Sequence, residues 1–224
     1  MNLLEMDMKL RFKTALACAS LMLGMAPAHA DPVVDRTMAL AGSWAHIKYA
    51  TPEAAQADAM TRLKAQADAA VAGAPGRAEP LVWDGIITST LAGLKGGFGG
   101  LSLAKEARGL LERAEKIDGN ALDGSAHTSL GALYYQVPGW PVGFGNKDKA
   151  RAELLAGLKL NPRGIDSNFF WADFLYNQGD YAEAAKALRT ALAAPPRPGR
   201  EAADAGRRGE IQKLLGTVNA KLRS

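Results

Sequence analysis

Few side chains in this sequence could carry out chemistry, and their spacing favours none of the common catalytic or metal-binding patterns. The two histidines beyond the first 30 residues, His46 and His127, lie far apart, and neither belongs to an H-E-x-x-H motif. No serine stands on a nucleophile elbow, and the single cysteine, Cys18, lies in the N-terminal segment. We therefore predict a protein that is not an enzyme and that has no catalytic residues, no cofactor and no metal site.

Asp173 is the carboxylate that stands out, because it lies beside Trp171 and Phe169 in an amphipathic segment. Most other acids alternate with bases along the chain, a pattern typical of solvated helix surfaces. Two roles stay open for Asp173. It could accept a hydrogen bond from an adjacent helix, or it could contact a bound partner.

Two glycine-rich runs, residues 96–100 and residues 137–146, interrupt the helical pattern. Neither has the spacing of a phosphate-binding loop, and neither follows a predicted strand, so we do not expect phosphate binding. We predict that both runs are loops, the second longer than a plain helix-to-helix turn requires. For Trp140 and Phe144 in that second run, two interpretations stay open: they cover the groove between helices, or they help to build a ligand or partner site.

The chain is basic, with a formal net charge of +4, but its charges alternate in sign. The only local excess is the cluster Arg197, Arg200, Arg207 and Arg208. Because interleaved charges are typical of a solvated face, we predict no nucleic-acid partner.

The first 30 residues have the pattern of a secretory signal peptide. A basic region (Lys9, Arg11, Lys13) precedes an apolar stretch over residues 14–25, and Ala28-His29-Ala30 forms a cleavage site. The stretch is too short to span a membrane. We predict cleavage before Asp31 and a periplasmic or secreted protein without a membrane span; the alternative is an uncleaved N-terminal anchor.

The rest of the chain has the periodicity of helices arranged in hairpins. Residues 168–196 predict two helices joined by a turn at residues 177–180, and this segment resembles a tetratricopeptide repeat (TPR). Ala150, Leu154 and Gly157 stand 34 residues before their counterparts in that segment, which indicates a second copy. We predict an all-α fold of stacked, TPR-like hairpins, an α-solenoid with terminal capping helices. The expected parts are a helical pair over residues 31–77, repeats over 78–196 and a capping helix over 197–224.

The run LGALYYQVPGWPVGFGNKDKA, followed by LKLNPRGIDSNFFWADFL, is similar to the T-component (TatT-like) proteins of TRAP transporter systems. The resemblance implies a periplasmic all-α protein that associates with a TRAP solute-binding protein. It also implies self-association, since members of that family form trimers. From it we expect an exported scaffold that binds a protein partner. The alternative is a carrier that encloses a small apolar ligand in an aromatic groove.

Helix geometry selects the residues of the expected binding surface. In a TPR the first helix of each hairpin lines the concave groove, and neighbouring residues of a helix point about 100° apart. If Tyr134 packs inward, Tyr135 therefore faces the groove. The predicted groove residues are Tyr135, Gln136, Asp173, Tyr176 and Asn177, with Trp140 and Phe144 as a lip or lid.

Overall fold

The computed structural model describes residues 31–223, and the predicted signal peptide and its cleavage site lie outside these residues. Within the described range, regular structure is helical apart from one isolated bridge between Gly139 and Gly145. The helices are α2 (Pro32–Ala50), α3 (Glu53–Gly73), α4 (Ala78–Lys95), α5 (Gly97–Asp118), α6 (Ala121–Gln136), α7 (Lys147–Leu160), α8 (Ile165–Gln178), α9 (Tyr181–Leu192) and α10 (Glu201–Lys221). None of them is both long enough and apolar enough to cross a membrane.

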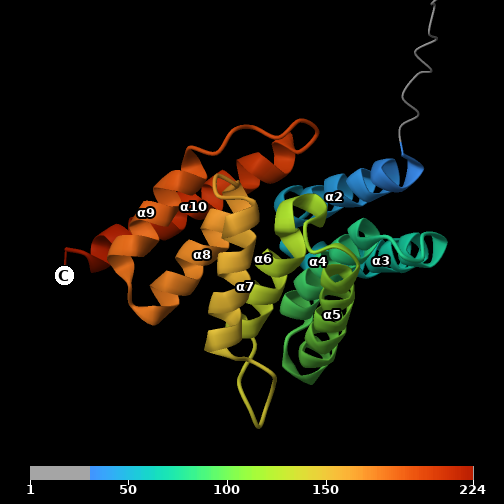
Figure 1. The fold of residues 1–224 in the computed structure, drawn as a ribbon, viewed down its shortest axis with the longest axis horizontal. Helices are drawn as coiled ribbons and strands as arrows, with labels where there is room; N and C mark the ends of the chain where they lie inside the picture. Colours follow the sequence, from blue (N-terminus) through green and yellow to red (C-terminus); the bar gives the residue numbers. More distant parts are fainter. Residues whose placement is uncertain (1–30, 224) are drawn as a thin grey trace, which may run out of the picture. The chain divides into compact units, whose positions relative to one another are not determined.

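The helices pack as hairpins, which confirms the predicted all-α stack. Pairs α4–α5, α6–α7 and α8–α9 form three successive units, and α2 and α3 precede them (Figure 1). Small residues allow the two helices of a unit to cross closely. A Cβ atom added at Gly131 would lie 2.6 Å from Leu154 Cγ, and one added at Gly85 would lie 2.6 Å from Leu111 Cγ. In the α4–α5 and α6–α7 units, the glycine thus makes room for a leucine of the second helix.

The two glycine-rich runs differ from each other, and the expectation of two loops is wrong for the first. Only Gly96 separates α4 from α5, and residues 97–100 form the first turn of α5. Gly96 and Gly97 adopt positive φ angles of 59° and 55°, and a Cβ atom at Gly100 would lie 2.5 Å from the carbonyl oxygen of Ala92. The glycines therefore permit an abrupt reversal instead of a loop.

The second run is a true loop, visible in Figure 1 as the projection between α6 and α7. The amide of Gly145 donates to the carbonyl oxygen of Pro138 at 2.9 Å, and the amide of Asn146 donates to that of Tyr134 at 2.8 Å. Phe144 folds back against Tyr134, with an edge-to-face ring distance of 5.9 Å. Trp140 points away from the protein and is 90% exposed.

The last helix closes the stack by returning to the first. Helix α10 packs on α8 and α9, where Ile211 and Val218 are fully buried, and it also contacts α2. Gly206 of α10 lies so close to Tyr49 of α2 that an added Cβ atom would be 2.4 Å from the ring. Both terminal helices do cap the stack, as predicted, but they also touch each other. Leu222, just past the end of α10, is 49% exposed.

Candidate functional site

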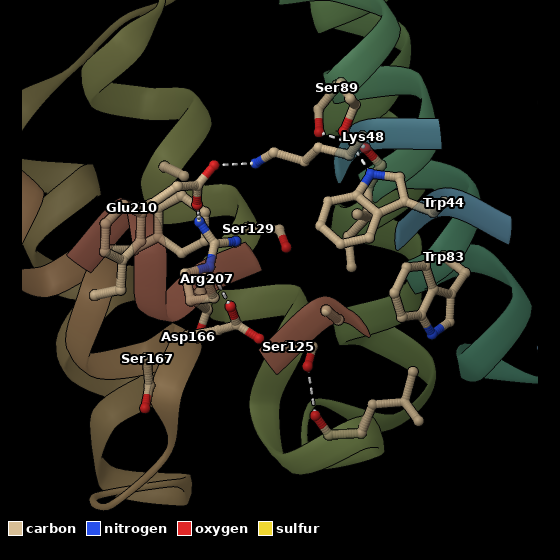
Figure 2. Close-up of a pocket in the computed structure, with 18 of the residues that line it drawn as sticks. Trp44, Lys48, Trp83, Ser89, Ser125, Ser129, Asp166, Ser167, Arg207 and Glu210 are labelled. Atoms are coloured by element: carbon tan, nitrogen blue, oxygen red, sulfur yellow. Dashed lines mark hydrogen bonds and ion pairs between the residues drawn. The ribbon is translucent and has the colours of Figure 1, made fainter. Parts of the chain in front are cut away.

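A cavity of about 630 Å³ lies where α2, α4, α6, α8 and α10 meet. Its walls combine aromatic rings, hydroxyl groups and charged side chains, several of which are drawn in Figure 2. The size falls within the range of about 300–1,000 Å³ typical of small-molecule sites. Because α10 packs against α2, the last helix adds a further wall to the cavity.

Aromatic residues form one part of the wall. Trp44 of α2 and Trp83 of α4 meet edge to face at 5.8 Å between ring centroids. The Trp44 Nε1–H group donates to Thr90 Oγ1 at 2.9 Å, which fixes the orientation of the ring. On α8, Phe169 and Phe170 line the cavity with their rings 5.3 Å apart. Such rings give a ligand with an apolar body a large contact area at a small cost in side-chain entropy.

Charged residues form a network along the same wall, where Arg207 lies over Phe169 and Phe170. The buried guanidinium of Arg207 lies between Asp166 and Glu210, with its Nε 2.7 Å from Asp166 Oδ1 (Figure 2). Arg197 approaches Asp166 Oδ2 at 2.8 Å, and Lys48 of α2 reaches Glu210 Oε1 at 2.9 Å. Burial alone would raise the pKa of Asp166, but the charges of Arg207 and Arg197 hold that pKa below its usual value. Asp166 is therefore charged at neutral pH, and the network ties α8 and α2 to α10.

Arg200 also lines the cavity, and it differs from the other basic residues there because the described residues form no ion pair with it. Its guanidinium carbon lies 4.9 Å from the centre of the Trp83 ring. Its Nε atom is buried without a hydrogen-bond partner. Burial, and then the nearby charge of Arg197, lower the pKa of Arg200. A buried donor without a partner is costly, so this position favours an acceptor that the protein itself does not supply.

Four of the five predicted groove residues lie together in one hydrogen-bonded cluster. The hydroxyl of Tyr135 donates to Asp173 Oδ2 at 2.5 Å, and Gln136 Nε2 donates to the Tyr135 hydroxyl at 3.1 Å. Asn177 Nδ2 donates to the backbone carbonyl of Asp173 at 2.7 Å. Asp173 thus accepts a hydrogen bond from the adjacent helix α6, one of the two roles considered for it. Within this cluster, Gln136 and Asp173 also line the central cavity.

The remaining predicted residues lie elsewhere. Tyr176 packs against Tyr181 at 5.7 Å, in the apolar cluster between α8, α9 and α10. Phe144 lies under the guanidinium of Arg108, whose carbon is 4.5 Å from the ring centre. Neither Phe144 nor the exposed Trp140 lines the central cavity, so neither forms a lid over it.

The functional residues that sequence reasoning missed are the cluster of arginines. Arg197, Arg200 and Arg207 were noted only as a local excess of positive charge, but all three line the cavity. The sequence does contain a feature that could have identified Arg207: it lies one helical turn before Ile211, on the apolar side of the last helix. A long basic side chain on an apolar stripe indicates a buried ion pair or a site.

A second, mostly apolar cavity of about 480 Å³ lies at the tip of α4–α5 beside the 137–146 loop. Phe98, Leu101, Val137 and Val142 are among its lining residues. Several large apolar side chains here face solvent: Phe98 is 91% exposed, Trp140 90% and Val142 60%. We call Phe98, Trp140 and Val142 the apolar tip.

A scan against protein-family models finds no match for this chain, and a search of curated proteins finds none either. The functional interpretation therefore rests on the geometry of the cavities and on the sequence.

Proposed function

We propose that this protein binds a small organic anion with an apolar body in its central cavity. The observation that carries the proposal is Arg200, which lines the cavity beside Trp44 and Trp83 and has no ion pair among the described residues. A carboxylate would accept from the guanidinium in a charge-assisted hydrogen bond. The apolar body of the ligand would then lie against the rings.

In this proposed role the cavity binds its ligand and does not catalyse a reaction. Arg207 forms ion pairs with both Asp166 and Glu210. Such fixed pairs suit a rigid and oriented wall better than proton transfer. Helix α10 adds a further wall to the cavity, which favours a compact solute over a long peptide. This refines the small-ligand alternative drawn from the sequence by adding a charged group to the apolar solute.

The cellular setting is also a proposal. The signal-peptide pattern of residues 1–30 and the resemblance to T-component proteins support a periplasmic role. In that setting the bound anion would be a solute exchanged with a TRAP solute-binding protein, and self-association of the chain would bring several cavities together.

We expect Arg200→Gln to weaken carboxylate binding by about 10- to 100-fold, the effect typical of losing a hydrogen bond to a charged group. The measurement is isothermal titration with a series of aryl and alkyl carboxylates, each compared with the alcohol of the same carbon skeleton. Arg62→Gln is the matched control, because Arg62 is exposed on α3 and does not line the cavity. Alcohols that bind as tightly as the carboxylates, or unchanged binding by Arg200→Gln, would contradict the proposal.

A second candidate function, docking of a protein partner, is favoured by the apolar tip. Patches of exposed, large apolar side chains are uncommon on protein surfaces away from interaction sites. We expect Phe98→Ser combined with Val142→Ser to reduce capture of a periplasmic solute-binding protein by at least about tenfold, given the usual weight of aromatic anchors. Leu222→Ser is the control, since Leu222 is 49% exposed at the far end of the chain. Equal capture by the tip variant and the control would rule out docking at this surface.

A further inference from the structure

Three side chains that bind metals well in proteins meet where α5, α6 and α7 pack together. His127 Nδ1 lies 2.8 Å from Glu153 Oε2 and 3.8 Å from Glu115 Oε1. One ligand atom from each residue lies within 4.8 Å of the other two. All three residues are half-buried, and none lines the central cavity or the apolar cavity at the tip.

Close helix packing holds the histidine in this position. Gly157, one turn after Glu153, lies against the residue next to His127: a Cβ atom there would be 2.5 Å from Thr128 Oγ1. On the other side, a Cβ atom at Gly119 would be 3.1 Å from His127 Nε2. The imidazole therefore lies between the end of α5 and the face of α7, with its Nδ1 directed at the two carboxylates.

The electrostatics of the cluster favour a cation. The carboxylates of Glu115 and Glu153 both face the same imidazole nitrogen, His127 Nδ1. Glu112 lies nearby as a third acid, and Lys116 as a base. A single imidazole shared by two carboxylates leaves the negative charge undercompensated, and a divalent ion would relieve this repulsion.

We propose that Glu115, His127 and Glu153 form a Zn²⁺ site. In a tetrahedral zinc site with bonds of about 2.0–2.1 Å, neighbouring ligand atoms lie about 3.3 Å apart. The two distances from His127 Nδ1, 2.8 and 3.8 Å, fall on either side of that value. Small side-chain movements would suffice, and water would take the fourth position. The ion would join the α4–α5 and α6–α7 hairpins, whatever ligand the central cavity binds.

The test is zinc titration of the protein that begins at Asp31, purified without a histidine tag and stripped of metal. We expect one zinc per chain by calorimetry and by elemental analysis after dialysis. With free zinc at a hundred times the dissociation constant, the unfolding midpoint should rise by about 5–10 °C. Magnesium should cause no such shift, because its preferred ligands are six oxygens in octahedral geometry.

Matched variants separate this site from adventitious binding. His127→Gln should lose both the bound zinc and the rise in the unfolding midpoint. His46→Gln removes the other described histidine, which is exposed on α2, and should retain both. If His127→Gln does not fold, Glu115→Gln at the more exposed edge of the cluster decides the matter by the same two readouts. A parent that takes up no stoichiometric zinc would overturn the proposal, as would variants of the cluster that bind zinc as the parent does.

Discussion

Replacing Arg207 with methionine should lower the free energy of unfolding by about 3–5 kcal/mol at pH 7, the usual cost of removing one partner from a buried ion pair. The side chain of Arg207 is 5% exposed, and its loss removes the cation that Asp166 of α8 and Glu210 of α10 share. Urea denaturation followed by circular dichroism measures the change. Arg189→Met, an exposed position on α9, is the matched control and should change stability little.

The effect of Arg207→Met should depend on pH in a defined direction. The pKa of Asp166 is lower in the folded protein than its usual value, so its ion pairs contribute stability above the unfolded pKa of about 3.9. That contribution is lost as the pH falls through the folded pKa. We therefore expect the difference between variant and parent to be largest above about pH 5 and to shrink below about pH 4. A difference that grew in acid would mean that Asp166 is not the group stabilised by Arg207.

The second large effect is expected from Gly131→Leu. A Cβ atom alone would lie 2.6 Å from Leu154 Cγ and 3.1 Å from the Leu154 backbone nitrogen. A whole leucine side chain would force α6 and α7 apart, which we expect to cost at least about 3 kcal/mol, the upper part of the range for overpacked cores. Thermal unfolding provides the measurement.

The control for this variant is the same substitution where space is available. Gly109 lies in α5, and a Cβ atom there has no neighbour within 4 Å. Leucine has the higher helix propensity, so Gly109→Leu should stabilise the protein by about 0.5–1 kcal/mol. If both variants lose the same stability, the close crossing of α6 and α7 is not the reason for glycine at position 131.

The hairpins could be predicted because their determinants are local. Gly131 and Ala172 mark the close crossings, and the turn before Asp180 ends α8 with Gly179 in the left-handed conformation. The error at residues 96–100 has the same local origin. Glycines are typical of loops, but here they form the first turn of α5, where Gly100 lies too close to Ala92 for a side chain. Propensity alone does not distinguish the two cases.

The site could be predicted only in part, because its residues come from distant segments. Periodicity identified the face that carries Tyr135 and Asp173, and the two residues do touch. Nothing local indicates that Arg207 pairs with Asp166, which is 41 residues away. The cluster around His127 is similar: its ligands lie on three helices, so no motif spacing links them. Which residues meet in this way depends on the rotation between successive hairpins. The sequence of a single helix does not indicate that rotation.

The contact between α2 and α10 also bears on the order in which this protein folds. In an open repeat array each unit depends only on its neighbours, so folding can begin anywhere and spread. Here the hydroxyl of Tyr49 donates to Glu210, a residue 161 positions later in the chain. A contact of such long range has a large loop-closure entropy and forms late. During synthesis the hairpins can therefore assemble one after another, but the cavity is complete only once α10 has left the ribosome. A chain that ends before Gly206 would keep most of its helices and lose the cavity wall that α10 supplies.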